Sequence, residues 1–305
     1  MDKIDEIIHL AESLEQDVYL NEPLSEHTTF KIGGECPAFV DISSASALCV
    51  LIKAANELGE KYMIIGNGSN LLFDDLGYDG VIFHLGKKLS DITVRDGRIR
   101  AEAGASLMSV CRAALDAGLS GLEFAYGIPG SVGGAVFMNA GAYGGEIKDV
   151  LESCEVIDQN GDIKTLTADE MELSYRKSVL QQTGETLLTA VFKMKRERDR
   201  SMIEADMKEY MHRRREKQPL EYPSAGSTFR RPEGYFAGKL IQDSGLKGFS
   251  IGGAQVSEKH SGFVINKGGA TFADVTALIK AIQEKVKKDS GQTLECEVLI
   301  KRRGE

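Results

Sequence analysis

Three clusters of glycine and small polar residues are the parts of this chain whose composition and spacing could support chemistry. The first, Gly66-Asn67-Gly68-Ser69-Asn70, directly follows the apolar run Tyr62–Ile65, which predicts a strand. Backbone N–H groups and short polar side chains at the carboxyl end of a strand can hold a phosphate group. A tight turn that uses glycine for positive φ explains these residues equally well. Leu71 stands where a third glycine would complete a dinucleotide fingerprint, so a standard Rossmann site is excluded.

The second cluster is denser in glycine and has apolar flanks. It runs Gly127-Ile128-Pro129-Gly130-Ser131-Val132-Gly133-Gly134 and continues as Asn139-Ala140-Gly141-Ala142-Tyr143-Gly144-Gly145. Buried backbone groups must find hydrogen-bond partners, so this loop predicts a large ligand with phosphates and heterocyclic edges. A dinucleotide laid across both clusters fits this expectation. The alternative is a glycine-rich packing seam between domains, which we disfavour because apolar packing does not need so many glycines.

The third cluster, residues 223–232, combines a serine flanked by small residues with several cations. Ser227 follows Gly226, but Phe229 replaces the second glycine of a nucleophile elbow. No histidine or aspartate is placed to argue a hydrolytic triad. Judged alone, Ser227 is an ordinary turn residue.

Composition and charge exclude several classes of protein. The 305 residues are 42% hydrophobic and 27% charged, which excludes a disordered or coiled-coil chain. With 46 acidic and 37 basic residues the net charge is -9, so the chain offers no general footprint for nucleic acid or anionic lipid. Short apolar runs and an N-terminus without a basic region predict no membrane span, no signal peptide and a cytoplasmic location. The five cysteines and five histidines show neither metal-ligand spacing nor a disulfide framework, so we predict reduced, mostly buried cysteines and no metal.

The elements that must position these clusters follow from hydrophobic periodicity and turn residues. A lead-in helix over residues 4–14 breaks at residues 21–23, and a β-α-β unit covers residues 38–65. Two hairpins turn at Asp96-Gly97 and Asn160-Gly161, and Ser106 opens a helix that ends at Gly118. Further predictions are strands over 80–85, 186–195 and 294–300, a charged helical connection over 196–218, a Gly-rich region over 225–269, and an amphipathic helix over 272–286. A domain boundary is expected near Met202.

Six motifs in this order resemble those of the UDP-N-acetylenolpyruvoylglucosamine reductase (MurB) family of bacterial peptidoglycan synthesis. They reach from Thr28 to Val298 and so cover most of the chain. The motifs are Thr28-Thr29-Phe30-Lys31-Ile32-Gly33-Gly34, the first cluster, the second cluster, Tyr175-Arg176, Gly226-Ser227-Thr228-Phe229 and Glu297-Val298.

The resemblance implies an α+β fold with a vanillyl-alcohol-oxidase (PCMH)-type FAD-binding domain of two α/β subdomains and a C-terminal α+β substrate-binding domain. The implied boundaries are 1–30 for a lead-in, 31–201 for the FAD-binding domain (subdomains of about 31–90 and 91–201) and 202–305 for the substrate-binding domain. FAD would be held non-covalently by Gly66, Asn67, Gly68, Ser69, Asn70, Gly127, Ile128, Pro129, Gly130, Ser131, Gly133, Gly134, Asn139, Ala140, Gly141, Ala142 and Tyr143.

The implied reaction is the NADPH-dependent reduction of UDP-N-acetylglucosamine enolpyruvate to UDP-N-acetylmuramate through enzyme-bound FAD. No second nucleotide domain is visible, which agrees with the family's alternating use of one site by both substrates. By the resemblance, Arg176, Ser227 and Glu297 are catalytic. An arginine and a neutral carboxyl group can stabilise the negative charge that hydride addition builds, and a serine can deliver the proton. Without the resemblance, a surface salt bridge for Arg176 and an ordinary strand charge for Glu297 are preferred.

Further residues are expected to bind the substrate: Tyr175, Lys217, Arg231, Gln255, His260 and Asn266. For any one of the last five, a surface or packing role is as good an explanation. The short connection over 196–218 leaves no room for the loop and tyrosine with which one branch of the family closes its site, so the shorter, loop-lacking type is expected. No protein partner is evident.

Two other functions are compatible with the same residues. One is an FAD-dependent oxidase of the same fold, although the His or Cys that often tethers flavin there is absent from residues 66–70 and 127–143. The other is a non-catalytic nucleotide-sugar binder. A yellow protein bleached by NADPH supports the reductase, whereas a colourless one that cannot be reconstituted with FAD supports the binder.

Overall fold

A computed structural model describes residues 2–194 and 196–304. The chain forms two compact units, each assembled from three separate segments. The first unit contains residues 1–20, 37–67 and 80–213, and the second contains residues 21–36, 68–79 and 214–305. The domain boundaries expected from the sequence divide the chain into continuous stretches, whereas the second unit also includes the short segments 21–36 and 68–79.

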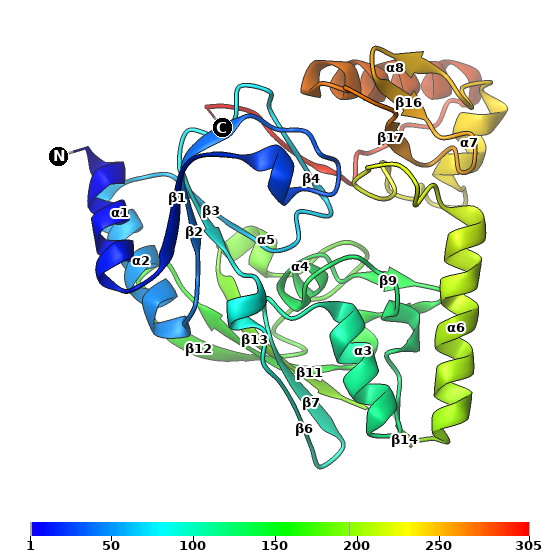
Figure 1. The fold of residues 1–305 in the computed structure, drawn as a ribbon. Coiled ribbons are helices and arrows are strands. Elements are labelled where there is room, and N and C mark those ends of the chain that lie inside the picture. The colour runs from blue at the N-terminus through cyan, green and yellow to red at the C-terminus, as the bar shows by residue number, and fades with distance from the viewer. Residues whose placement is uncertain (1, 195, 305) are drawn as a thin grey trace. The chain divides into compact units, whose positions relative to one another are not determined.

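A small sheet with two helices forms the N-terminal part of the first unit. Helix α1 (Lys3–Ser13) lies beside α2 (Ala45–Leu58) (Figure 1). The sheet has the order β1 (Asp17–Pro23), β2 (Glu35–Asp41), β5 (Val81–His84), β3 (Tyr62–Ile65), and β2, β5 and β3 are parallel. Helix α2 begins where Ser44 Oγ accepts a hydrogen bond from Ala47 N and ends at left-handed Gly59, which confirms the predicted β-α-β unit.

Strand β1 was not predicted. It is largely exposed and ends at a proline, so it shows little of the apolar alternation by which strands are recognised. The rest of the lead-in prediction, a helix from about residue 4, is confirmed by α1.

A five-stranded antiparallel sheet forms the second part of the first unit. Its order is β12 (Ile163–Thr167), β11 (Leu151–Ile157), β13 (Thr186–Lys193), β7 (Arg98–Glu102), β6 (Ile92–Arg95). Both predicted hairpins are present, and Asp96 and Gly97 have the positive φ angles, 50° and 72°, of a tight hairpin turn. Strand β13 ends at Lys193; Lys195, the last residue of the predicted strand, lies outside the described residues, as do Met1 and Glu305.

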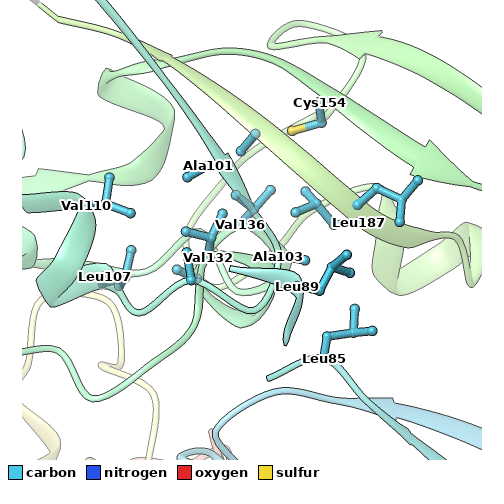
Figure 2. Close-up of a cluster of buried hydrophobic side chains, with 14 of the residues drawn as sticks. Leu85, Leu89, Ala101, Ala103, Leu107, Val110, Val132, Val136, Cys154 and Leu187 are labelled. Carbon is cyan, nitrogen blue, oxygen red and sulfur yellow. The ribbon is translucent and has the colours of Figure 1, made fainter. Parts of the chain in front are cut away.

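Two helices pack on this sheet and build its core. Helix α3 (Leu107–Asp116), capped by Ser106 as predicted, packs on β6 and β7, and the short α4 (Val132–Phe137) packs on β7 and β13. Figure 2 shows their apolar side chains, including Val110, Val132 and Val136, gathered against Ala101 and Leu187 of the sheet. Helix α4 lies inside the second glycine cluster, which the sequence presented only as a loop.

The connection over residues 196–218 is helical only in part. Strand β14 (Arg196–Glu197) first pairs with β8 (Leu119–Ser120), and α6 (Arg200–Lys217) follows. Asp199 accepts hydrogen bonds from the Ser201 backbone N–H and hydroxyl, which fixes the start of the helix and corrects the prediction of a helix from residue 196. The expected boundary near Met202 falls within α6, and the two compact units divide the chain later, after Arg213.

The second unit contains α7 (Ala237–Asp243), α8 (Phe272–Ser290) and an antiparallel sheet of β15 (Ser250–Ile251), β16 (Ala254–Val256) and β17 (Val264–Asn266). The predicted amphipathic helix is confirmed by α8, where Thr271 and Asp274 cap each other's backbone N–H and Val275, Leu278 and Ile282 are fully buried. A separate parallel pair joins β4 (Leu71–Phe73) to β18 (Leu299–Lys301), so the predicted final strand begins later than residue 294. Within the described residues, no helix is long and apolar enough to cross a membrane.

Candidate flavin and substrate site

The two glycine clusters that were predicted to share a ligand meet in the first unit. A Cβ on Gly66 would lie 2.2 Å from Ser131 Oγ, and Asn67 Nδ2 donates a hydrogen bond of 3.3 Å to Pro129 O. Ser131 is buried and caps α4, where its hydroxyl accepts from Gly134 N. Gly127 and Gly130 are also buried, and Pro129 is exposed. The loops therefore form one continuous backbone surface.

Glycine at residues 133 and 134 serves two different purposes. A Cβ on Gly133 would meet the Ala103 Cβ and carbonyl at 3.3 Å, so the packing of α4 on the sheet requires a small residue there. Gly134 is exposed, has helical φ, and the nearest atom to its Cβ would be Ser131 Oγ at 3.7 Å. Glycine costs about 1 kcal/mol relative to alanine inside a helix, and the chain's own packing gives no reason for it at Gly134. Bare backbone at this position fits the close approach of a cofactor.

A tight hairpin follows α4 and carries the end of the second cluster. Strands β9 (Gly141–Ala142) and β10 (Gly145–Glu146) pair across Tyr143 and Gly144, which both have positive φ. The Tyr143 ring, half-exposed, stacks on Tyr210 of α6 with ring centroids 4.7 Å apart and an interplanar angle of 5°. This ring stack packs the turn at Tyr143 against helix α6.

Asn139 was predicted to contact FAD, but the structure commits its side chain to the protein. It is fully buried, and its Nδ2 donates to Glu146 Oε2 at 2.8 Å and to Ser174 O at 3.0 Å. Its Oδ1 accepts from Lys148 N at 2.9 Å. The geometry therefore favours a structural role, joining the hairpin to the segment that contains Arg176.

Arg176 occupies an unusual backbone conformation. Ser174 and Lys177 exchange backbone hydrogen bonds of 3.1 and 3.0 Å, so Tyr175 and Arg176 form the tip of a two-residue turn. Arg176 has φ of 56°, in the left-handed region that favours glycine. Its guanidinium lies 5.2 Å from the centroid of the exposed Tyr175 ring.

The rest of the first cluster belongs to the second unit, a division that the sequence did not indicate. Gly68 has φ of 58°, and a Cβ there would lie 2.0 Å from His27 O, so the chain itself requires glycine. Asn70 Nδ2 donates to Glu297 O at 3.1 Å, and Leu299 N donates to Asn70 O at 2.9 Å. Ser69, which lies between Gly68 and Asn70 in the sequence, is partly exposed. Residues 68–70 therefore contact, through Asn70, the segment that contains Glu297.

The structure brings Ser227 and Glu297 onto neighbouring segments of the second unit. Glu297 N donates to Thr228 O at 2.8 Å, and the next residues, Phe229 and Cys296, form an antiparallel bridge. Thr228 N in turn donates to Gly262 O at 2.8 Å. Thr228 is buried, whereas Ser227 is exposed.

Four of the predicted substrate residues present their side chains at the surface of their unit or close to it. Tyr175 is exposed, Lys217 ends α6, and the Arg231 guanidinium lies 4.5 Å from the centroid of the Phe236 ring. His260 is half-buried, and its Nδ1 faces Gly262 N at 3.1 Å. Because an N–H donates in this contact, Nδ1 must be unprotonated. Burial also lowers the pKa of His260.

The other two predicted substrate residues are buried, and their amide groups bond within the second unit. Gln255 Nε2 donates to Gly248 O and Ser250 Oγ, and its Oε1 accepts from Lys267 Nζ at 3.0 Å. Asn266 Oδ1 accepts from the backbone N–H groups of Gly268 and Ala270. The geometry favours structural roles for both, and neither is carried into the proposed site.

The cysteines and possible metal ligands were also expected to have no role in the chemistry. Burial raises the pKa of the Cys36 and Cys154 thiols to about 12, and all five cysteines are free. Three are buried and two partly buried, which confirms the prediction of mostly buried thiols. Across the described residues, no group of three His, Cys, Asp or Glu side chains could hold a metal ion.

Comparison with known proteins matches both parts of the chain. Residues 37–167 match the family described as FAD binding domain, and residues 218–301 match "UDP-N-acetylenolpyruvoylglucosamine reductase, C-terminal domain". A UDP-N-acetylenolpyruvoylglucosamine reductase of Clostridium perfringens is 50% identical over 286 residues, 94% of this chain and 93% of the relative. That of Caldanaerobacter subterraneus is 49% identical over 300 residues, 98% and 97% of the two chains. The crystal structure of the Thermus caldophilus reductase (MurB) is similar with a TM-score of 0.80 and 34% identity, over 94% of this chain and 98% of that one.

The two family matches define an FAD-dependent oxidoreductase with an FAD-binding domain and a separate C-terminal domain, as the resemblance of the sequence predicted. More specifically, the chain belongs to the UDP-N-acetylenolpyruvoylglucosamine reductase family and has that family's reductase activity in peptidoglycan precursor synthesis.

Proposed function

We propose that this enzyme reduces the enolpyruvyl group of UDP-N-acetylglucosamine enolpyruvate with NADPH, and that Arg176, Ser227 and Glu297 act on the reacting group. FAD, when bound, would supply hydride transfer between NADPH and the enolpyruvyl double bond. The residues proposed to hold it are the joined loops at Gly66, Asn67 and 127–134, together with the hairpin at residues 140–143. Residues 68–70 are proposed to support the site through Glu297.

The chemistry asks for one proton and for stabilised negative charge. Hydride addition to the β carbon of an enol ether that carries a carboxylate places negative charge on the α carbon and the carboxylate oxygens. The Arg176 guanidinium, already charged, can stabilise the carboxylate without reorganisation. Glu297 can do the same by donating a hydrogen bond if its carboxyl group is protonated. Ser227 can give its hydroxyl proton to the basic α carbon and regain one from water.

The observation that carries the proposal is the pairing of the Ser227 and Glu297 segments through Thr228. These hydrogen bonds join the segment that contains the Ser227 hydroxyl to the segment that contains the Glu297 carboxyl group, and the Ser227 side chain is exposed. Tyr175, Lys217, Arg231 and His260 are proposed to bind the substrate, the cations through the diphosphate. With no second nucleotide-binding domain apparent in the sequence, NADPH and the UDP-sugar are proposed to use one site in turn.

Ser227→Ala separates the two half-reactions and tests the assignment. Reduction of the enzyme by NADPH requires no proton transfer to a substrate carbon, so the rate of flavin bleaching is expected to stay unchanged. Reoxidation by the enolpyruvyl substrate is expected to slow by at least about 100-fold, the loss typical of removing a general acid. Both rates are measured by stopped-flow absorbance of the flavin.

Ser224→Ala is the matched control, because Ser224 lies in the same segment and has no proposed role in proton transfer. It is expected to leave both rates near those of the unsubstituted enzyme. Unchanged reoxidation in Ser227→Ala would show that the proton comes from another group. Equal slowing of both half-reactions would indicate a defect in folding or flavin binding and would contradict a proton-donor role.

A further inference from the structure

We propose that Gln181 is a positioning residue for the reduction: it holds the backbone of Arg176, and Asn139 holds the opposite side of the same turn. The inference rests on the proposed catalytic role of Arg176. It adds two residues that are inferred to act on the reaction through that arginine. All the contacts that support it lie within the first unit.

The starting observation is the strained backbone at Arg176. In a two-residue turn closed by Ser174 and Lys177, the second tip residue has φ of 56°. Glycine or asparagine is usual at such a position, because a Cβ makes the left-handed conformation unfavourable. A non-glycine residue keeps this conformation only where its surroundings hold it there, and such residues are frequent at functional sites.

Gln181 supplies one such restraint. It lies on α5 (Leu180–Thr183), the short helical turn that follows Arg176. Its Nε2 donates to Phe137 O at 2.8 Å and to Arg176 O at 3.2 Å. One side-chain amide group therefore bonds to the carbonyl groups of both residues, and it also lies 3.8 Å from Met138 Sδ.

The hydrogen bond to the Phe137 carbonyl connects Gln181 to helix α4 of the flavin domain. Phe137 is the last residue of α4, and carbonyls at a helix C-terminus have no donor within the helix. This carbonyl is satisfied by Gln181 and by Ser178 Oγ, also at 2.8 Å. Ser131 of the glycine cluster caps the start of the same helix, and Gly134 lies in its first turn. Gln181 thus ties the Arg176 backbone to the element proposed to hold the flavin.

Asn139 restrains the other end of the turn from the same segment. It lies two residues beyond Phe137 and donates from Nδ2 to Ser174 O at 3.0 Å, while its other two contacts are with Glu146 of the β-hairpin and with Lys148 N, just after that hairpin. Hydrogen bonds therefore hold the turn at Ser174, before its tip, and at Arg176, the second tip residue, and both connect it to residues 137–139. Since the backbone conformation sets the direction of the Arg176 Cβ, loss of a restraint lets the turn relax and redirects the guanidinium. A charged group that must meet developing charge loses its effect when displaced.

Gln181→Met tests the inference because methionine keeps the length of the side chain and removes both donors. Gln182→Met, on the exposed neighbouring residue of α5, is the matched control. In Gln181→Met we expect unchanged flavin content and an unchanged rate of bleaching by NADPH. Reoxidation by the enolpyruvyl substrate is expected to slow between about 10- and 100-fold, as for a misplaced reacting group. Gln182→Met is expected to leave both rates unchanged.

A double-mutant cycle with Arg176→Ala distinguishes positioning from general stability. If Gln181 acts through Arg176, adding Gln181→Met to Arg176→Ala slows reoxidation no further. Hydrogen exchange of the backbone amides at residues 174–177 gives a readout independent of activity, and we expect faster exchange in Gln181→Met. If Gln181→Met does not yield flavin-loaded protein, Gln181→Glu, which keeps the shape and replaces the donor by an acceptor, enters the same cycle with the same expectation.

The results that would overturn the inference are distinct from those that would overturn the proposed function. If Arg176→Ala slows reoxidation strongly but the effect of Gln181→Met simply adds to it, Gln181 does not act through Arg176. Equal slowing of both half-reactions by Gln181→Met, or an equal effect of Gln182→Met, contradicts positioning in the same way. If Arg176→Ala itself leaves reoxidation unchanged, the proposed role of Arg176 is wrong and the inference falls with it.

Discussion

Gly66 lies against Ser131 so closely that a Cβ on Gly66 would be 2.2 Å from the serine hydroxyl oxygen. The two residues come from loops 65 residues apart in sequence, one following β3 and the other preceding α4. Such a contact leaves no room for a side chain, because the Ser131 Cβ would also be only 3.1 Å away. The absence of a side chain at Gly66 is therefore what allows the two glycine clusters to form one surface.

Gly66→Ala is expected to separate the clusters and to lower the content of bound FAD. The ratio of flavin to protein after purification, taken from the absorbance spectrum, measures the effect. Adding Ser131→Gly removes the atoms that the new methyl group would meet and is expected to restore most of the flavin. Ser131→Gly alone is the control. It keeps the backbone N–H groups of residues 127–134, and glycine is an acceptable helix cap that costs only a few tenths of a kcal/mol, so it is expected to lose much less flavin than Gly66→Ala. Full flavin content in Gly66→Ala would contradict this account of the loops.

Local sequence signals predicted the elements that have strong caps and turns. Ser44 with Gly59 bounds α2, Ser106 begins α3, and the Asp96-Gly97 pair supplies the left-handed residues of a hairpin. Each of these signals acts within a few residues, so it can be read without knowing the fold. The motif resemblance identified the loops and the three proposed catalytic residues.

Contacts between distant segments could not be predicted in this way. The pairing of β4 with β18 joins residues 71–73 to 299–301, and neither strand is long enough to show periodicity. The helix α4 has three glycines or alanines among its six residues, so composition indicated a loop. The side chains of Asn139, Gln255 and Asn266 look like ligand-binding groups in sequence, and only the structure shows that their hydrogen bonds are internal. No sequence pattern pointed to Gln181, because its proposed role depends on a hydrogen bond to the Phe137 carbonyl, 44 residues away in the sequence.

Asn70→Asp is expected to weaken the Glu297 segment while leaving flavin in place. Aspartate keeps the shape of the side chain and loses the N–H that bonds to Glu297 O, so the free energy of unfolding should fall by about 1 kcal/mol. Reoxidation by the enolpyruvyl substrate should slow more than reduction by NADPH, because the carboxyl group proposed to stabilise charge loses a support.

The contrasting control for Asn70→Asp is Asn67→Asp, three residues earlier in the same cluster. Asn67 bonds to Pro129 O in the first unit, so its substitution should lower flavin content instead. Chemical unfolding, flavin content and the two half-reaction rates distinguish the variants. Loss of flavin in Asn70→Asp, together with normal reoxidation of the molecules that still contain flavin, would contradict the assignment of different roles to Asn67 and Asn70.

His260 is expected to make the enzyme less stable below about pH 6.5. Burial lowers the pKa of this histidine in the folded protein below its ordinary value of 6.5, so the unfolded chain binds the proton more readily. Stability therefore falls as the pH decreases from 6.5 to the folded-state pKa, and the loss is complete below that pKa. Protonation of Nδ1 would also remove the acceptor for Gly262 N.

Urea unfolding between pH 5 and 8 should show a smaller loss of unfolding free energy at low pH in His260→Gln than in the unsubstituted protein. His9→Gln, at an exposed histidine of α1, should retain the full loss. Identical pH dependence in His260→Gln and His9→Gln would mean that other groups cause the acid sensitivity.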